Sequence, residues 1–370
     1  MEQTEPTTNT QHQPQQPGGC SKWLSILLMV LIGGAFGGLR SYLKLQNKQH
    51  PSTNEYTRTE KYNTIVEDGV TYRVYSIKRV AYVSKKEDLS SYTGVIRVKE
   101  SVTYKRRSYP VVGIDEEAFA FDEELEEVIL PPGIKEIRNN AFEGCSMLQR
   151  INFPAQLQEI GFQAFRFCKQ LKEVQIPAYC SIRSDAFSYC TALERFVFLE
   201  ETAEQEVSSS LFSGRIEGGA FSYCYALNQV EIRHRRAYFS GADLLMFIDS
   251  YTPVFHGCGR LSDIQISDSC SLIHSVNGLV LSGDSTTLLL CPPAFAGKKG
   301  QLTLPDCVTR IDNYAFAGCN RLTQIHIPKT VEYIGQYAFK GCTKAVIVID
   351  NPETQCYDNS FEGCKGVNVK

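Results

Sequence analysis

The sequence lacks every short motif that is typical of a catalytic centre. It has no Cys-x-x-Cys pair and its six histidines are scattered, so the spacing that usually binds zinc is absent. Neither a Gly-x-Ser-x-Gly motif nor a Gly-x-x-x-x-Gly-Lys phosphate loop occurs. The formal net charge of −3 predicts no general affinity for nucleic acid. We therefore expect no enzyme, no cofactor and no bound metal.

The first sixty residues contain almost no material for a folded domain. Residues 1–21 are mostly Gln, Thr and Pro, which predicts a disordered tail. Trp23 to Leu39 then runs 17 residues without a charge, between Lys22 and Arg40. At about 1.5 Å per residue an α-helix of this length reaches about 25 Å, which spans a bilayer core if the flanking side chains snorkel. We predict a single-pass transmembrane helix over residues 22–40 and a linker over residues 41–60.

Three aspects of this anchor stay open in the sequence. A cleaved signal peptide is the competing interpretation, but a basic segment before the apolar run and a small-residue cleavage site after it are both missing. The glycine-rich helix could pair two copies, although glycine is common in membrane helices generally. Basic residues after the helix, Arg40, Lys44 and Lys48, favour a cytoplasmic body by the positive-inside rule.

A phenylalanine recurs in near-identical surroundings through the rest of the chain. The successive gaps are 23, 23, 22, 34, 34, 61, 23 and 22 residues. Periods of roughly 20–50 residues are typical of stacked repeat units that share one continuous core. The recurring residues are Phe119, Phe142, Phe165, Phe187, Phe221, Phe255, Phe316, Phe339 and Phe361.

One repeat unit reads EIRNNAFEGCSMLQRINFP, residues 136–154. Its apolar residues up to Leu148 are spaced by one, three or four positions, which predicts a short helical turn with one buried side. Ile151 and Phe153 then alternate with Asn152, as in a strand with one face inward, and Pro154 ends that strand. We predict an α/β solenoid over residues 113–370, with one parallel β-ladder and short helical turns.

Eight cysteines stand three residues after a recurring phenylalanine. This position is apolar, so we expect the thiols to pack as small buried hydrophobes without redox or metal chemistry. Neighbouring coils lie within reach of a disulfide by distance alone, but parallel side-chain directions argue against one. The residues are Cys145, Cys168, Cys190, Cys224, Cys258, Cys319, Cys342 and Cys364.

The repeat resembles the BspA-like leucine-rich repeats, whose unit combines L-x-x-[VI]-x-[IL]-P with I-G-x-x-A-F-x-x-C. Residues 156–168 (QLQEIGFQAFRFC) and 330–342 (TVEYIGQYAFKGC) carry this pattern closely. The stretch from Val70 to Phe119 is similar to the lead-in segment found ahead of such repeats. The resemblance implies an exported surface protein, periplasmic or at the cell surface, that takes part in adhesion, in conflict with the orientation that the flanking charges favour.

The repeat stack is interrupted at three places. Insertions are predicted near residues 200–213 and 235–251, in the two 34-residue gaps. Asn277-Gly278 and the following LVLSGDSTTLLLCP predict an inserted hairpin near residues 275–293. Insertions in solenoids lie on one rim, where they either carry recognition or merely decorate the stack.

A β-rich cap is predicted over residues 61–112. It carries eleven Lys or Arg against five Asp or Glu, whereas residues 113–150 carry ten acids against three bases. The simplest interpretation is that the basic cap covers the open edge of the acidic first repeat. A membrane-surface role for Lys105, Arg106 and Arg107 is the alternative.

The outward strand positions form the candidate binding face for an unidentified protein or glycan. They are Asn152, Gln175, Val197, Glu231, Gln265, His326 and Val348. We expect a membrane-anchored scaffold for adhesion or cell-surface interaction. The alternatives are an envelope structural protein that binds cell wall or its own copies, through the C-terminal repeat or the membrane helix, and a cytoplasm-facing interaction module.

Overall fold

The computed structural model describes residues 61–88, 90–201, 214–240 and 252–370. Residues 61–370 form one compact unit. The predicted tail, membrane helix and linker, residues 1–60, lie outside the described ranges. Within those ranges, none of the structure is a helix with the length and apolar character needed to cross a bilayer.

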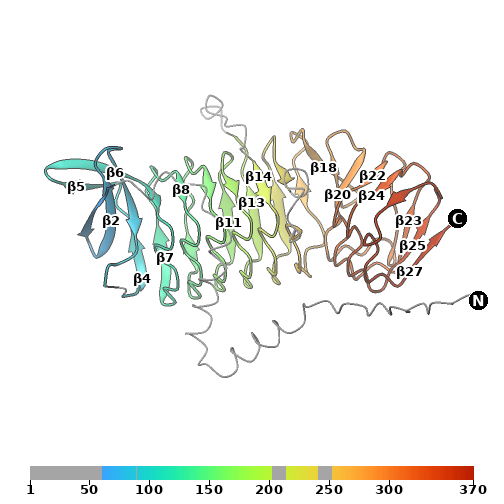
Figure 1. Ribbon diagram of the computed structural model, residues 1–370, viewed down its shortest axis with the longest axis horizontal. Helices are drawn as coiled ribbons and strands as arrows, with labels where there is room; N and C mark the ends of the chain where they lie inside the picture. Colours follow the sequence, from blue (N-terminus) through green and yellow to red (C-terminus); the bar gives the residue numbers. More distant parts are fainter. Residues whose placement is uncertain (1–60, 89, 202–213, 241–251) are drawn as a thin grey trace, which may run out of the picture. The chain divides into compact units, whose positions relative to one another are not determined.

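The described chain begins with a small antiparallel sheet. Its strands are β1 (Asn63–Glu67), β2 (Val70–Tyr75), β3 (Val80–Ser84), β5 (Ser101–Tyr104) and β6 (Arg107–Ile114). β1, β2 and β3 pair antiparallel, whereas β6 pairs parallel with both β3 and the first repeat strand β8 (Glu136–Ile137). These strands occupy the segment for which the sequence predicts a cap, and they join it to the repeats without a break (Figure 1).

Charge pairing accompanies this junction between the cap and the first repeat. Asp115 has a side chain that is only 6% exposed, and it pairs with Arg73 of the cap at 2.6 Å and with Arg138 at 2.9 Å. Tyr82 of the cap donates a hydrogen bond of 2.5 Å to Glu136. Buried carboxylates are stable only when they are paired in this way, so the basic cap and the acidic first repeat complement each other.

The repeats form two parallel ladders rather than the single one that the sequence predicts. The first ladder continues the cap sheet through β8, β10 (Glu159–Ile160), β12 (Ser181–Ile182), β14 (Arg215–Glu217) and β16 (Tyr238–Ser240). It resumes later in the chain with β22 (Arg310–Ile311), β24 (Tyr333–Ile334) and β26 (Gln355–Cys356). Two-residue strands of this kind show no alternation in the sequence, which is why the second ladder was not predicted.

The other ladder contains the strands that the sequence does predict, and it is divided into three sheets. The first holds β4 (Gly94–Arg97), β7 (Leu125–Ile129) and β9 (Arg150–Ile151). The second holds β11 (Glu173–Ile176), β13 (Arg195–Phe198), β15 (Gln229–Ile232) and β17 (Gln265–Ile266). The third holds β21 (Gln301–Thr303), β23 (Gln324–Ile327), β25 (Val346–Ile349) and β27 (Gly366–Val369).

An antiparallel insertion separates the two halves of the stack. Strands β18 (Ile273–Val276), β19 (Leu279–Ser282) and β20 (Thr287–Leu290) occupy the segment for which the sequence predicts a hairpin. β20 then pairs parallel with β22 and so restarts the first ladder. Most of the other two predicted insertions, residues 202–213 and 241–251, lies outside the described ranges.

The predicted helical turns are wrong: the described residues contain no α-helix. In the segment around Phe142, every second backbone N–H bonds within the turn, as Ala141 does to Arg138, and the others bond to the next coil, as Phe142 does to Ala164 at 2.7 Å. Asn140 and Gly144 have positive φ angles of 57° and 76°, which no α-helix accommodates. Apolar residues spaced by three or four share one side in both arrangements, so periodicity alone could not separate them.

The recurring phenylalanines form two columns of stacked rings inside the unit. The column from Phe119 to Phe255 has neighbouring centroids 4.9–5.6 Å apart and ring planes within 15°. The second column runs from Phe316 to Phe361 with the same geometry. All of these rings are at most 1% exposed except that of Phe361, which is half-buried. Offset stacking adds about 0.5–1.5 kcal/mol per aromatic pair to the burial itself.

The repeat cysteines are free thiols that pack beside these rings. Each also donates a hydrogen bond to the coil before it: Cys145 Sγ lies 3.0 Å from the carbonyl oxygen of Phe119, and Cys342 Sγ lies 3.0 Å from that of Phe316. Seven of the eight bond a recurring phenylalanine, whereas Cys319 bonds Cys291 and Pro292. The packing role is confirmed, and the donor role explains why a thiol occupies this position.

Candidate functional site

The structure distributes the predicted binding face over all three sheets of the second ladder. Gln175, Val197, Glu231 and Gln265 lie in direct register across β11, β13, β15 and β17, so they form one row. His326 and Val348 are in register in the third sheet. Asn152 follows β9 in the first sheet. The predicted face is therefore three surfaces that share a ladder.

Two members of this row do not face solvent, which corrects the prediction. Val197 is 1% exposed and Val348 is 8% exposed. They are the two apolar residues of the set, and burying them removes apolar surface from water. Their side-chain type was the signal that should have excluded them from a binding face.

Asn152 has a structural contact that the sequence does not reveal. Its side-chain oxygen accepts a hydrogen bond of 2.7 Å from the Leu130 N–H, and its amide nitrogen donates one of 2.9 Å to the Leu130 carbonyl. The amide group thus replaces the backbone of a strand, and β9 ends one residue earlier. This substitution lies where the first sheet of the ladder stops and the second begins.

A groove of about 920 Å³ opens at this break between β9 and β11. Its half-buried apolar lining includes Ile151 and Phe153, and the Phe153 ring meets that of Phe165 edge-on at 5.6 Å. Exposed polar side chains surround this lining, among them Arg150, Lys172 and Gln175. An apolar centre with a polar rim is the usual arrangement of a protein-binding surface.

Ion pairs run along the strands beside the groove. Arg195 contacts both Glu173 and Glu231, the latter at 2.8 Å, and Arg233 also contacts Glu231. These hydrogen bonds, from Arg195 first and Arg233 second, lower the pKa of Glu231. Exposed pairs contribute only about 0–1 kcal/mol each, so the row keeps its charges oriented more than it stabilises the fold.

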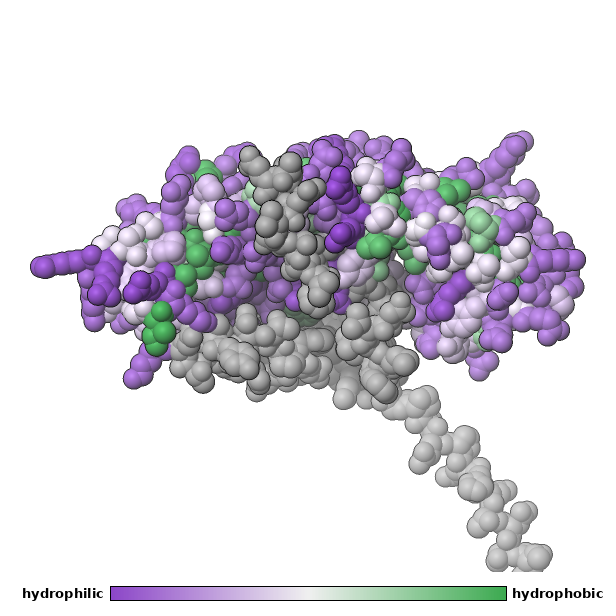
Figure 2. Space-filling view, turned by 90° about the horizontal axis from the view of Figure 1, so that it is seen from above, coloured by the Kyte–Doolittle hydropathy of each residue, from purple (hydrophilic) through white to green (hydrophobic). Residues whose placement is uncertain are grey.

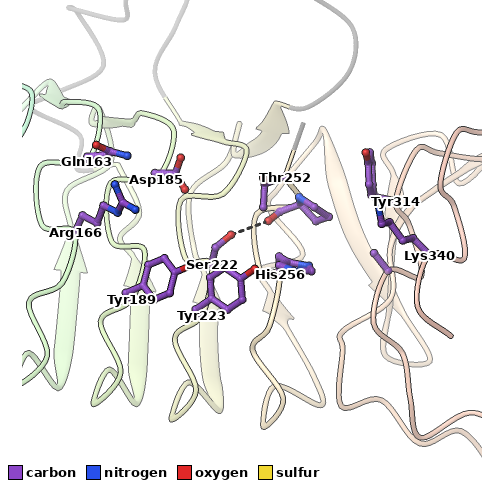
Figure 3. A pocket seen from close by; sticks show the side chains of 12 residues that line it. Gln163, Arg166, Asp185, Tyr189, Ser222, Tyr223, Thr252, His256, Tyr314 and Lys340 are labelled. Atoms are coloured by element: carbon purple, nitrogen blue, oxygen red, sulfur yellow. Dashed lines mark hydrogen bonds between the residues drawn. The ribbon is translucent and has the colours of Figure 1, made fainter. Parts of the chain in front are cut away.

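A second hollow, of about 400 Å³, lies at the corner where the turns stack, and the sequence gave no indication of it. Figure 3 shows Tyr189 and Tyr223 side by side, with His256 next to Tyr223. The two tyrosine rings stack with centroids 4.6 Å apart and planes at 19°, and His256 meets Tyr223 edge-on at 5.1 Å. We call this group the aromatic corner. The tyrosines recur at 34-residue spacing two residues after Phe187 and Phe221, which was the signal available in the sequence.

The far side of this hollow belongs to the second half of the stack. Lys340 and Tyr314 line it, and they come from coils beyond the inserted strands β18–β20 (Figure 3). Burial first, and then the Lys340 charge, lower the pKa of His256, so its imidazole is neutral at neutral pH. Arg166 lies over the Phe167 ring at 4.7 Å. Aromatic rings with hydroxyl and cationic groups around them suit a sugar, which has an apolar ring face and polar edges.

The remaining titratable groups show no grouping for metal chemistry. Within the described ranges, no three His, Cys, Asp or Glu side chains are close enough to hold a metal ion. His326 pairs with Asp350 at 2.7 Å, and Lys370 pairs with the same carboxylate at 3.0 Å. This trio closes one end of the third sheet as an ordinary ion-pair network.

The family model of the BspA type leucine rich repeat region matches the chain in six copies. The matches span residues 101–216 and 294–369, which is just over half of the chain. The segment between them contains both 34-residue gaps and the strands β18–β20. No curated protein matches the sequence.

Two solved structures share the fold. A leucine rich cell surface protein from Faecalibacterium prausnitzii A2-165 is 19% identical, with a TM-score of 0.53, over 84% of this chain and 96% of that one. The pneumococcal vaccine antigen PcpA is 18% identical, with a TM-score of 0.62, over 84% of this chain and 82% of its own. At these identities the likeness shows the architecture alone.

Proposed function

The chain belongs to the BspA-type leucine-rich-repeat family, and from this premise we propose that it is a membrane-anchored, non-catalytic scaffold for adhesion or cell-surface interaction. The groove between β9 and β11 carries the proposal, because it combines an apolar centre, a polar rim and about 920 Å³ of open space. The two similar structures include one described as a cell surface protein, which supports display outside the cell. The apolar run from Trp23 to Leu39 supports the anchor.

The anchor and its orientation are tested on intact cells. Extraction at high pH leaves an integral protein in the membrane pellet, so recovery in the supernatant would contradict the anchor. Protease treatment of intact cells releases the repeat unit if it is displayed outside. Full protection from protease, with cleavage after the cells are opened, would instead support a cytoplasmic or periplasmic body.

We propose that the groove binds a protein partner. Replacing Arg150 and Gln175 by alanine removes two rim side chains that are exposed and not part of the core. In biolayer interferometry against a panel of extracellular-matrix proteins, we expect the double variant to lose at least about tenfold in affinity, or about 1.4 kcal/mol. Lys298→Ala with Gln301→Ala, two exposed residues elsewhere, is the matched control. Equal affinities of the two variants would contradict the assignment.

The aromatic corner favours a second ligand class, an uncharged oligosaccharide. Its cations are already compensated, because Arg166 lies 3.8 Å from Glu143 and Lys340 lies 3.4 Å from Glu362. We expect Tyr223→Ala to abolish calorimetric binding of chitohexaose, cellohexaose or maltohexaose, and Tyr333→Ala, a tyrosine of the first ladder, to preserve it. Absence of binding to all three sugars by the unchanged protein would contradict a glycan site here.

Self-association through the C-terminal repeat is a further proposal. β27 pairs with β25 along one edge, and Val367 and Val369 are 39% and 58% exposed. Exposed apolar strand residues favour pairing with another chain. Analytical ultracentrifugation in detergent should show dimers that Val367→Lys with Val369→Lys converts to monomers, whereas monomers of the unchanged protein would contradict it.

A further inference from the structure

The hairpin β5–β6 ends in an unusual turn. Its two central residues, Lys105 and Arg106, both have positive φ angles, 48° and 65°. Two-residue turns of this geometry normally contain Asn and Gly, because other residues adopt the left-handed region with strain. Figure 1 shows the hairpin projecting from the cap. The protein therefore keeps two long cationic side chains at the tip of a projection, where small residues would form the turn with less strain.

The charge at this tip is not compensated by the rest of the cap. Lys105, Arg106 and Arg107 are all exposed, and none of them has an ion-pair partner among the residues that the structure describes. Lys99, by contrast, pairs with Glu67 and Asp68, each at 3.0 Å. Figure 2 shows hydrophilic side chains extending from the end of the unit where β5 lies. The tip is thus a free cationic surface beside a neutralised one.

The tip adjoins the point where the chain enters the cap. Tyr104, the residue before the turn, donates a hydrogen bond of 2.8 Å to the side chain of Asn63, the first residue of β1. Residues 1–60 therefore join the cap beside the cationic tip. The predicted membrane helix ends at residue 40, so about 20 residues separate it from this place, a span of at most about 70 Å when extended.

An exposed apolar side chain lies near the same entry point. The ring of Tyr62, the residue before β1, is 5.8 Å from that of Tyr75, the last residue of β2. The turn that follows carries Ile77, which is 85% exposed, followed by Lys78 and Arg79. An isolated apolar residue among cations is the pattern of side chains that enter the headgroup region of a membrane.

We propose that Lys105, Arg106 and Arg107, the basic tip, together with Ile77, dock the cap on anionic phospholipid headgroups of the bilayer that holds the anchor. Juxtamembrane basic residues bind anionic lipids with about fivefold gain per residue close to the surface. The tether keeps the tip near the bilayer, so three such residues are sufficient to hold it there. Docking orients the stack at a fixed angle to the membrane and leaves the groove and the aromatic corner free. The proposal rests on the proposed membrane anchor.

Hydrogen exchange of the full chain in vesicles tests it. The protein is reconstituted in phosphatidylcholine vesicles, with or without roughly a third of phosphatidylglycerol, at about 0.1 M salt, where the Debye length is about 10 Å. We expect exchange of peptides covering residues 74–81 and 101–110 to slow at least fivefold in the anionic vesicles. Raising the salt to about 1 M, which shortens the Debye length to about 3 Å, should remove the protection.

Variants assign the effect to the tip. Lys105→Gln, Arg106→Gln and Arg107→Gln together should abolish the difference between the two vesicle types, each protein being compared with itself. Lys298→Gln, Lys299→Gln and Lys344→Gln remove the same charge from exposed distant positions and should leave the difference unchanged. Identical exchange in both vesicle types, or loss of protection in the control triple variant, would overturn the proposal.

Two further outcomes are separated by the same material. Equal protection by soluble polyphosphate in detergent would assign the tip to soluble polyanions and overturn membrane docking. Protein that fails to float with any vesicle would overturn the anchor itself, whereas protein that floats without protection overturns the docking alone.

Discussion

The two halves of the stack share one interior and differ at the corner. In both halves the phenylalanine rings stack with nearly parallel planes and the cysteine thiols bond the previous coil. Two residues after each phenylalanine, however, the first half carries aromatic residues such as Tyr189 and Tyr223, whereas the second half carries glycine, as at Gly318 and Gly341. The core is repeated, and the corner is where the sequence is free to vary.

Backbone geometry gives this difference its meaning. The corner residue has a positive φ in both halves, 61° at Tyr189 and 73° at Gly341. Glycine adopts this region without strain, whereas other L-residues lose about 1–2 kcal/mol. The first half therefore retains strain at the positions where the aromatic corner lies, and such retained strain is typical of functional sites.

The interior is expected to be the most sensitive part of the first half. Phe165→Ala removes a fully buried ring that is stacked on both sides, and should cost about 3–5 kcal/mol in the free energy of unfolding. Phe361→Ala, at the half-buried end of the second column, should cost about half as much. Urea denaturation followed by circular dichroism measures both, and equal losses would contradict the difference between an inner and a terminal ring.

Two aspartates at opposite ends should give opposite pH dependence. Burial raises the pKa of Asp122, which is 7% exposed, from 3.8 to about 6. The folded state then binds the proton more tightly than the unfolded state, so its contribution to stability falls as pH rises from about 4 to about 6. This loss amounts to about 2–3 kcal/mol, and Asp122→Asn should remove it.

Asp350 provides the matched case in the second half. Hydrogen bonds from His326 first, and from Lys370 second, lower its pKa below 3.8. Its contribution is therefore present above about pH 4 and is lost as pH falls through the lowered pKa. Unfolding free energies of the unchanged protein and of each Asn variant, measured between pH 3 and pH 7, should differ with opposite slopes. The same slope for both variants would contradict the assignment.

Two corner glycines test the space around the turn. Gly144 and Gly318 have the same φ of 76°, but a Cβ at Gly144 would lie 2.6 Å from Phe121 Cδ1, whereas a Cβ at Gly318 would have no atom within 4 Å. Gly318→Ala should cost about 1 kcal/mol from the backbone alone, and Gly144→Ala about 2 kcal/mol because Phe121 must also shift. Thermal unfolding compares them, and a smaller loss for Gly144→Ala would show that Phe121 moves freely.

Much of the repeat architecture could be predicted from the sequence, because buried residues recur with their spacing. The phenylalanine and cysteine columns and the strands around Val174 and Ile325 follow from that spacing. The second ladder could not be predicted, because a strand of two residues such as Glu159–Ile160 has no period. The turns were mistaken for helices, because the positive φ of Asn140 leaves no apolar pattern.

The candidate sites were harder to predict than the fold. The row through Gln175 and Glu231 was predicted from alternation, but Val197 shows that an outward register does not guarantee exposure. The aromatic corner depends on contacts between coils 34 residues apart, with a far side beyond the inserted strands. Side chains that meet only through stacking of the coils leave no local signal in one unit.

Thiol reactivity should separate the inner coils from the terminal one. Cys258, in the first half, is fully buried, and burial raises its pKa to about 12, so almost none of it is thiolate near pH 8. Cys307 and Cys356 are exposed, and Cys364, in the last coil, is half-buried. We expect iodoacetamide to modify Cys307 and Cys356 at least about 100-fold faster than Cys258, with Cys364 in between, as read by peptide mass mapping of the native protein. Because a buried thiol reacts only when its coil opens, adding Phe361→Ala should speed Cys364 and leave Cys258 unchanged. Acceleration of both cysteines would mean that the two halves open together, and the difference between them would then lie only in their corners.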